Sequence, residues 1–205
     1  MKIKSFKNTI KWYDEHAEEY AHGVFKSSPL EVMNIFFEYL PEHPVLLDAG
    51  CGPGRDCDLM TQKGATVTGI DVSKGLLEQA QKRFPHIPFV QANFVDLPFK
   101  NEMFDGIWAH SSLVHLESIA DVKKALHEFY RVLKKKGILH VYVREKPPTD
   151  EKDLVFDKER FFRYFTQEEM GKYVEEAGFT IKENTLRHRR DGRKGIQWIC
   201  IFAEK

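Results

Sequence analysis

Three alternating glycines follow a short apolar segment of the chain. The segment VLLDAG (Val45–Gly50) continues as CGPGRD, which places Gly50, Gly52 and Gly54 in one loop before a helical pattern. A glycine loop between a strand and a helix N-terminus lets the backbone come close to a ligand. The dinucleotide pattern G-x-G-x-x-G requires a third glycine where this chain has Arg55. The loop therefore predicts a ligand site that departs from the dinucleotide rule.

Polar groups also occur at the ends of the next predicted strands. Asp71 lies 21 residues after Gly50, where an acid is placed to accept hydrogen bonds from both hydroxyls of an adenosine ribose. In the segment QANFVDLPF, Asn93 offers an amide to an adenine edge and Phe94 offers an apolar face to the ring. The carboxyl ends of parallel strands meet at one edge of a sheet, so we expect these residues to surround one ligand.

Strand-like and helix-like segments alternate along the chain and would position these residues. Strands covered on both faces are expected at Val45–Gly50, Thr66–Val72, Pro88–Asn93, Phe104–His110 and Gly137–Val143. Helices are expected at Asp56–Lys63, Ser73–Phe84, Ala120–Lys135 and Gln167–Ala177, with Lys134–Lys136 as a solvated helix end. This alternation predicts a doubly wound α/β sandwich.

Both ends of the chain depart from the alternation. Two helices outside the sheet are expected at Thr9–His22 and Pro29–Leu40. Near the C-terminus, FTIKENTL and IQWICIFAE are interpreted as two strands of an edge hairpin, joined by the polar segment RHRRDGRKG. This basic segment is the one basic concentration of the chain and could contact RNA or an acidic substrate, but we interpret it as a solvated hairpin tip.

The composition limits the classes of function. The chain has 205 residues, of which 42% are hydrophobic and 30% charged, as in one globular domain. Its 31 Lys+Arg residues balance 31 Asp+Glu residues, so no broad positive field favours nucleic acid or anionic lipid. Three cysteines make no disulfide framework, and no signal sequence or apolar run of about 20 residues is found. We therefore expect a cytoplasmic protein that binds neither nucleic acid nor a membrane.

Five segments in order resemble the motifs of class I S-adenosylmethionine-dependent methyltransferases. They are LLDAGCGPGRD, GIDVSKGLLEQA, QANFVDLPF, FDGIWAHSSLVHL and EFYRVLKKKGIL. The resemblance implies a Rossmann-like, three-layer α/β/α fold with seven strands in the order 3-2-1-4-5-7-6, the last strand antiparallel. It also implies a single methyltransferase domain over residues 1–205, with a helical lid at 1–44, a core at 45–205 and a lid insertion at 146–164. The implied cofactor is S-adenosylmethionine, with S-adenosylhomocysteine as product.

The same resemblance implies how the donor would be held. For the methionine part, Asp48 and the backbone of Ala49, Gly50 and Gly52 are the expected contacts, with the Ala109 carbonyl near the amino group. For the adenosine part, the resemblance implies that Asp71 binds the ribose and that Val72, Asn93 and Phe94 contact the adenine. Tyr20 belongs to an N-terminal helix that closes over the donor in similar proteins.

The acceptor is less well defined by the sequence. His110 and His115 flank the end of the fourth predicted strand, and an imidazole there could take a proton from a hydroxyl, thiol or amine. Further polar or aromatic residues are expected on this side: Trp12, Tyr13, His16, Arg144, Glu145, Arg163 and Tyr164. Arg144 or Arg163 could clamp an anionic group of the acceptor or form structural ion pairs. No spacing suggests a metal site.

We therefore predict an enzyme that methylates an O, N or S atom of a small molecule, as a monomer or homodimer. Three alternatives stay open at this point. An NAD(P)-dependent oxidoreductase is disfavoured by the glycine spacing. A donor-binding module without catalysis, or an RNA methyltransferase, would share the same donor motifs.

Overall fold

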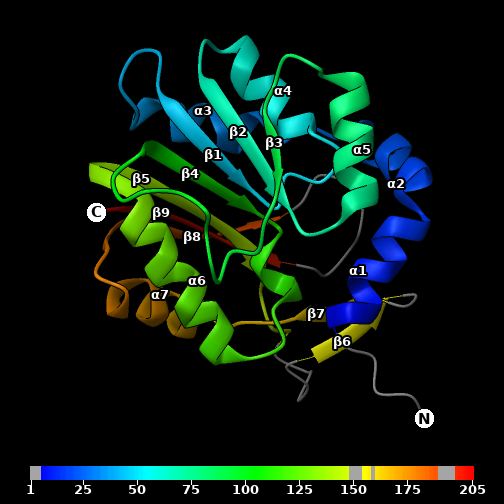
Figure 1. Ribbon diagram of the computed structural model, residues 1–205. Helices are drawn as coiled ribbons and strands as arrows, with labels where there is room; N and C mark the ends of the chain where they lie inside the picture. The colour runs from blue at the N-terminus through cyan, green and yellow to red at the C-terminus, as the bar shows by residue number, and fades with distance from the viewer. Residues whose placement is uncertain (1–5, 148–153, 158–159, 189–196) are drawn as a thin grey trace.

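Seven strands form the central sheet of the protein, whose computed structural model describes residues 6–147, 154–157, 160–188 and 197–205 (Figure 1). In chain order they are β1 (Val45–Ala49), β2 (Thr66–Asp71), β3 (Phe89–Gln91), β4 (Phe104–His110), β5 (Leu133–Arg144), β8 (Thr180–His188) and β9 (Gln197–Glu204). Across the sheet they run β3-β2-β1-β4-β5-β9-β8, and β9 is antiparallel to both its neighbours. Counting only these seven strands, the order is 3-2-1-4-5-7-6, so the predicted topology is confirmed.

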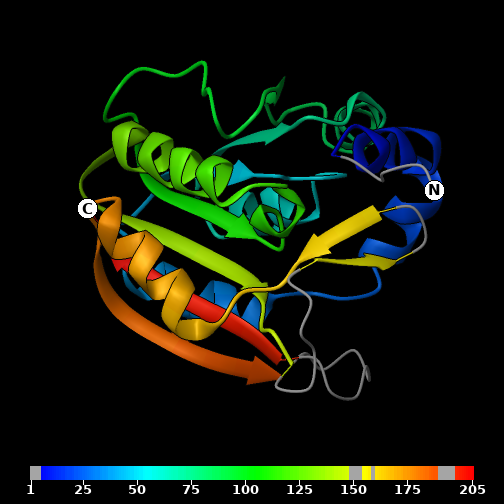
Figure 2. The ribbon, with the colours of Figure 1, turned by 90° about the horizontal axis from the view of Figure 1, so that it is seen from below.

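Helices cover both faces of this sheet. One face carries α3 (Leu30–Glu38), α4 (Arg55–Gln62) and α5 (Lys74–Arg83), and the other carries α6 (Ile119–Val132) and α7 (Gln167–Glu176) (Figures 1 and 2). Leu46 and Leu47 are both fully buried, one in the core cluster of each face. Successive strand residues point to opposite faces, so the continuous apolar run of β1 reflects burial on both sides.

The N-terminal helix is broken where a single helix was predicted. The structure has α1 (Phe6–Glu15) and α2 (Ala17–Val24), with His16 between them at φ −118° and ψ 21°. The His16 ring folds back, stacks on Trp12 at 4.5 Å between centroids, and bonds through Nδ1 to the Trp12 carbonyl at 2.9 Å. The His16 and Tyr20 amides still donate to the Trp12 and His16 carbonyls, at 3.0 and 2.9 Å, so the interruption is confined to the backbone angles of His16. The prediction of Thr9–His22 as one uninterrupted helix was wrong at this residue.

The prediction that Lys134–Lys136 end a helix was also wrong. Helix α6 stops at Val132, and β5 begins directly at the fully buried Leu133, which pairs with Phe104. Lys134 then forms an ion pair with Asp105 at 2.9 Å. Burial of Leu133 and the ion pair between Lys134 and Asp105 therefore stabilise the strand more than the lysines would stabilise a helix end.

The insertion after β5 contains two short strands. They are β6 (Leu154–Asp157) and β7 (Arg160–Arg163), which pair as an antiparallel sheet of two strands beside α1 (Figures 1 and 2). The Phe161 amide donates to Thr9 Oγ1 at 3.2 Å, which ties this insertion to the N-terminal helix. Residues 148–153 and 158–159 of the predicted lid insertion, and most of RHRRDGRKG, lie outside the described residues. Across the described ranges, every helix is too short or too polar to span a membrane.

Candidate active site

The glycine loop after β1 is folded by main-chain hydrogen bonds. The Gly50 and Cys51 amides both donate to the Ile70 carbonyl, at 2.8 and 2.9 Å. Gly50, Gly52 and Gly54 all have positive φ, between 54° and 84°, a region that favours glycine. A Cβ on Gly50 would lie 2.3 Å from the Ser112 Cβ, whereas a Cβ on Gly52 would meet nothing within 4 Å. The loop is therefore packed at Gly50 and open at Gly52.

The acid at the end of β2 joins this loop. Asp71 accepts from the Gly52 amide through Oδ2 and from the Ser73 amide through Oδ1, both at 2.9 Å. Burial raises the pKa of Asp71, although the hydrogen bonds from the Ser73, Gly52 and Val72 amides oppose that shift. Each carboxylate oxygen has a second lone pair, so the predicted ribose contacts remain chemically possible.

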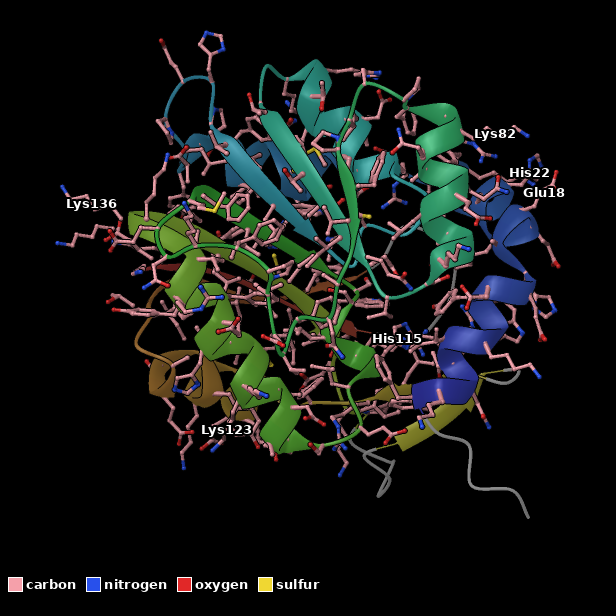
Figure 3. The ribbon with its side chains drawn as sticks, in the orientation of Figure 1. Glu18, His22, Lys82, His115, Lys123 and Lys136 are labelled. Atoms are coloured by element: carbon pink, nitrogen blue, oxygen red, sulfur yellow. The ribbon has the colours of Figure 1, made fainter. Side chains whose placement is uncertain are left out.

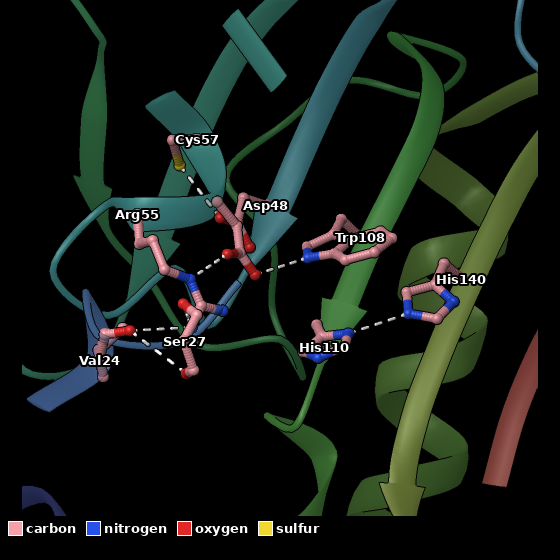
Figure 4. Close-up of polar contacts among 9 residues, drawn as sticks. Val24, Ser27, Asp48, Arg55, Cys57, Trp108, His110 and His140 are labelled. Carbon is pink, nitrogen blue, oxygen red and sulfur yellow. Dashed lines mark hydrogen bonds and ion pairs between the residues drawn. The ribbon is translucent and has the colours of Figure 1, made fainter. Parts of the chain in front are cut away.

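A second buried acid lies beneath the loop. Asp48 is 2% exposed and accepts from the Cys57 thiol at 3.1 Å (Figure 4). Burial raises the pKa of Asp48 well above its ordinary value, and the neighbouring Asp56 carboxylate adds to the shift. Asp56 in turn pairs with Arg55 at 2.6 Å and accepts from the Trp108 indole at 2.9 Å. These contacts fix the start of α4 against β1 and β4.

The predicted adenine residues follow two neighbouring strands, Val72 after β2 and Asn93 and Phe94 after β3, and they differ in exposure. Val72 and Asn93 are half-buried, and Asn93 Oδ1 accepts from the Val95 amide at 3.2 Å. Phe94 is 5% exposed and packs edge-on against Phe129 in the core. A cavity of about 110 Å³ borders Asn93 and is lined by Phe6, Asn93, Val95, Leu116, Glu117 and Asp121.

The N-terminal helices are fastened over this edge of the sheet at two points. Asp14 of α1 accepts from the Ser73 hydroxyl at 2.6 Å and from the Gly75 amide at 2.9 Å. Arg55 donates to the carbonyls of Val24 and Ser27, at 3.2 and 3.1 Å, just where α2 ends (Figure 4). We define the N-terminal lid as α1 and α2 together, residues 6–24. Tyr20 of this lid is half-buried and packs its ring edge-on against Tyr13 at 4.9 Å between centroids.

His115 uses both of its ring nitrogens within the protein. Nδ1 lies 2.9 Å from the Phe161 carbonyl, which can only accept, so Nδ1 carries the proton. Nε2 then accepts from the Tyr13 hydroxyl at 3.1 Å. Burial of the ring lowers the pKa of His115 to about 4, and the positive charges of Arg160 and Arg144 act in the same direction. His115 lies inward beside α1 (Figure 3), and these contacts favour a structural role over that of a free base.

His110 lies at the end of β4, next to the buried Ala109. Its ring is stacked on those of Tyr142 and Trp108, at 4.3 and 5.0 Å between centroids. Nδ1 is 3.2 Å from Nε2 of the fully buried His140 (Figure 4). The ring is therefore held in one orientation at the edge of the sheet where the donor is expected.

The other predicted acceptor residues do not form one cluster. Arg163 donates hydrogen bonds to the carbonyls of Leu116 and Glu117, in the segment after β4. These bonds favour a structural role for Arg163 over binding of an anionic group of the acceptor. Arg144 is 7% exposed and stacks on Phe162 with 3.7 Å between its guanidinium carbon and the ring centroid. The other predicted residues lie apart from one another. The His16 ring stacks on Trp12, Glu145 forms a backbone β-bridge with Phe165, and Tyr164 is half-buried.

The sequence analysis missed two groups of residues that shape this site. Asp14 and Arg55 connect the N-terminal lid to the core, and Arg160 places its guanidinium 4.3 Å from the Trp12 ring centroid. No local pattern signals these contacts, because Asp14 and Ser73 are 59 residues apart and Arg160 is separated from Tyr13 by 147. In the part of the chain that the structure describes, no three His, Cys, Asp or Glu side chains are grouped as metal ligands.

Comparison with known proteins finds a family model that is similar to the core of the chain. Residues 47–141 match the family model described as a methyltransferase domain, from the middle of β1 to the middle of β5. This segment, which makes up a little less than half of the chain, is similar to methyltransferase domains. The similarity agrees with the predicted cofactor, S-adenosylmethionine.

Individual methyltransferases similar to this chain carry different names. The O-methyltransferase resE of Aspergillus sclerotiorum is 29% identical over 95% of this chain and 74% of its own length. The ubiquinone/menaquinone biosynthesis C-methyltransferase UbiE of Campylobacter jejuni is 32% identical over 50% of this chain, but the match spans only 46% of UbiE. Several other curated relatives are likewise matched over less than two thirds of their length. O- and C-methyl transfer both occur in these names, so the methylated atom is left open.

A solved structure gives the same fold. The Burkholderia thailandensis 1,6-didemethyltoxoflavin-N1-methyltransferase, with bound 1,6-didemethyltoxoflavin and S-adenosylhomocysteine, aligns with a TM-score of 0.79 over 97% of this chain and 88% of its own. Its identity of 22% supports the methyltransferase fold alone.

The site of this chain fits an S-adenosylmethionine donor on its own geometry. The space in front of Gly52 would be filled by a Cβ, so the glycine leaves room for a ligand to approach the backbone. At the other end of the loop, the hydroxyl of Ser112, which packs against Gly50, is buried and makes no hydrogen bond within the described structure. A buried polar atom without a partner is costly, and a ligand that reached Ser112 could satisfy it.

Proposed function

We propose that this protein transfers a methyl group from S-adenosylmethionine to an O, N or S atom of a small-molecule acceptor. The observation that carries the proposal is the bond between the Gly52 amide and Asp71, at 2.9 Å. It joins the open glycine loop to the acid at the next strand end, so both lie at the carboxyl edge of the sheet. Open α/β sheets bind ligands at this edge.

The chain's own residues would bind and orient the reactants. Asp71 would accept from the ribose hydroxyls, and the backbone around Gly52 would face the methionine part. When bound, the donor supplies a methyl group on a positively charged sulfur, already activated toward an electron pair on the acceptor. The remaining task of the protein is to position the acceptor and exclude water. The N-terminal lid, held by Asp14 and Arg55, supplies that cover.

A small-molecule acceptor is supported by the charge balance and by relatives whose names include O- and C-methyltransferases. The net formal charge of zero gives no field for nucleic acid. Incubation with methyl-labelled donor and a panel of small hydroxyl, thiol and amine compounds should label one chemical class. A parallel incubation contains RNA in place of the small compounds. If only the RNA becomes labelled, and if binding of RNA to the protein weakens steeply as the salt concentration rises, the small-molecule proposal is wrong.

Donor binding is tested by isothermal titration with S-adenosylhomocysteine. We expect binding by the wild type, no binding of NADH, and a loss of about 1.5–3 kcal/mol in Asp71→Ala, the scale of hydrogen bonds to a charged group. Asp71 also supports the loop, so Asp71→Asn serves as the matched variant that keeps the shape of the side chain. Unchanged affinity in Asp71→Ala would remove Asp71 from the donor site.

A further inference from the structure

A glycine lies in the first turn of α5, where it does not favour the helix. Gly75 is the second residue of α5 and has no positive φ that would call for glycine. Glycine is a poor helix residue, because it loses more backbone entropy on folding than alanine does. A Cβ on Gly75 would lie 2.8 Å from the Asp14 carbonyl oxygen, 3.0 Å from the Asp14 Cα and 3.2 Å from the Ala17 Cβ. The missing side chain therefore makes room for the N-terminal lid, at the point where α1 is followed by α2.

The Asp14 carboxylate holds the lid at this point. Its Oδ1 accepts from the Ser73 hydroxyl at 2.6 Å and from the Gly75 amide at 2.9 Å. Hydrogen bonds to a carboxylate are stronger than those between neutral groups, and a negative charge is favourable at the N-terminus of a helix. We define the lid contact as these three residues: Asp14, Ser73 and Gly75. It combines a close approach of two backbones with two hydrogen bonds to a charged group.

Ser73 connects the lid contact to the predicted donor site. The residue is 1% exposed, and its hydroxyl also accepts from the Leu76 amide at 3.2 Å as the cap of α5. Its own amide donates to Asp71 Oδ1 at 2.9 Å. One buried serine thus bonds both to Asp14 of the lid and to the acid that is expected to bind the ribose. A shift of Ser73 with the lid would therefore change the position of Asp71.

The residue before Asp14 brings the lid near the same acid. Burial raises the pKa of Tyr13 well above its ordinary value, and electrostatic interactions with Tyr20 and, more weakly, with Asp71 act in the same direction. The Tyr13 ring packs on that of Tyr20, and α1 and α2 lie beside α5 (Figure 1). We expect a donor held by Asp71 to be covered by this part of the lid.

We propose that Asp14 is a positioning residue that keeps the N-terminal lid closed through the lid contact and thereby slows release of the donor and of its demethylated product. The identity of the ligand rests on the proposed function, whereas the lid contact rests on the geometry alone. A ligand beneath the lid leaves only after the lid opens. A weaker lid contact should therefore raise the dissociation rate constant more than it changes the association rate constant.

The lid contact can be tested without any ligand. In Gly75→Ala the new methyl group must displace the Asp14 backbone. Hydrogen exchange in residues 6–24 of the free protein should become about 10- to 100-fold faster, which is equivalent to losing a hydrogen bond to a charged group, while exchange in α4 stays the same. Unchanged exchange in the lid would overturn the proposal.

Gly23→Ala is the matched control. Gly23 lies in α2, and its Cβ would meet nothing within 4 Å. The variant adds the same methyl group to the lid itself without crowding the lid contact, so exchange in the lid should not become faster. If Gly23→Ala accelerates exchange as much as Gly75→Ala does, the lid responds to any added methyl group and the proposal fails.

Ligand release tests the consequence for the site. Labelled S-adenosylhomocysteine, chased with unlabelled ligand, should dissociate from Asp14→Ala about 10- to 100-fold faster than from the wild type, with a nearly unchanged association rate constant. Asp14→Asn keeps an oxygen that accepts from Ser73 and Gly75, and should restore part of the slow release. Both Asp14 variants add no atoms at Gly75, so they test the proposal even if Gly75→Ala does not fold.

The outcomes separate this inference from the proposed function. A lid that exchanges faster in Asp14→Ala, with an unchanged dissociation rate constant, would refute the link between the lid contact and ligand release. A wild type that does not bind S-adenosylhomocysteine would instead refute the proposed function, and the exchange result would stand.

A double variant tests whether the two changes act at one contact. Asp14→Ala combined with Gly75→Ala should release the ligand no faster than the faster of the two single variants, because residues in contact do not act additively. If the two accelerations multiply, Asp14 and Gly75 act at separate places and the lid contact as defined is wrong.

Discussion

The donor side and the acceptor side of this site are built in different ways. On the donor side, Gly50, Gly52 and Asp71 meet through main-chain amides, and the whole arrangement comes from two neighbouring strand ends. On the acceptor side, Tyr13 and His115 meet through side chains that are 102 residues apart in the sequence. A main-chain cradle can be encoded by a short local motif, whereas a wall of side chains depends on how distant segments pack. Substitutions should therefore affect the two sides differently.

The largest effect should come from adding a side chain at Gly50 in the glycine loop. Gly50→Ala places a Cβ 2.3 Å from the Ser112 Cβ and adds a non-glycine residue at φ 84°. We expect a loss of about 2–4 kcal/mol in the free energy of unfolding, from overpacking and backbone strain together. Urea unfolding followed by circular dichroism measures it.

The matched variant is Gly52→Ala, whose Cβ would meet nothing within 4 Å. Its stability should fall by only about 1 kcal/mol, the backbone cost alone. Its affinity for S-adenosylhomocysteine should fall sharply, because the new methyl group enters the predicted donor space. Equal stability losses in both variants would contradict the difference between a packed and an open glycine.

The next effect is the pH dependence of stability that His115, on the acceptor side, should cause. His115 has a pKa of about 4 in the folded protein and about 6.5 when unfolded. Between these values the unfolded state binds more protons, so stability falls as the pH falls from 6.5 to 4. We expect the free energy of unfolding to fall by about 2–3 kcal/mol over this pH range. The shift in pKa alone would give a larger figure, but His115 is half-buried and solvent screens part of its charge.

His115→Gln isolates this contribution, because the buried carboxyl groups of Asp48 and Asp71 titrate in both proteins. The stability difference between wild type and variant should be largest above pH 6.5 and should shrink toward pH 4. A difference that stays constant from pH 7 to 4.5 would mean that His115 titrates normally.

A smaller effect concerns the connection between the two sides. Arg55→Met removes the hydrogen bonds to the carbonyls of Val24 and Ser27 and the ion pair with Asp56. We expect about 1–2 kcal/mol of destabilisation, and faster hydrogen exchange in the last turn of α2 than in α4. Arg55→Lys keeps the charge and should recover part of the protection. Exchange that increases equally throughout the protein would argue against a local fastening.

The smallest effect is expected from Tyr13→Phe. This change keeps the ring contacts with Tyr20 and His115 but removes the hydroxyl that bonds to His115 and Arg160. We expect a loss of about 1 kcal/mol in stability and no change in donor affinity. If Tyr13→Phe weakens donor binding as much as Asp71→Ala does, the division into two sides is incorrect at this residue.

Much of the fold could be predicted because its signals are local. The apolar run of β1, the glycine loop and Ser73 as the cap of α5 each act within a few residues. The early start of β5 at Leu133 could not be predicted, since it depends on pairing with Phe104, which competes with helix propensity. Tertiary context decided that position. The interruption at His16 is a change of backbone angles at one residue, for which the sequence carries no glycine or proline signal.

The site divides in the same way. Asp71 and the glycine loop were found from spacing, and they come together at the carboxyl edge of the sheet. The candidate bases could be selected only by residue type, and the sequence did not show that His115 is fully bonded to Tyr13 and Phe161. Nor did it show that His140 lies behind His110, because neighbouring strands reveal their register only when folded.

The N-terminal lid has a consequence for how the chain is made. Asp14 bonds to Ser73 and Gly75, about 60 residues further along the chain, whereas Thr9 bonds to Phe161 and Tyr13 to Arg160, about 150 residues further along. The lid can therefore dock on α5 early in synthesis, but its contacts are complete only after β7 has been made. We expect chains that end before β7 to hold the lid on α5 and to leave the Trp12 ring without its contact to Arg160.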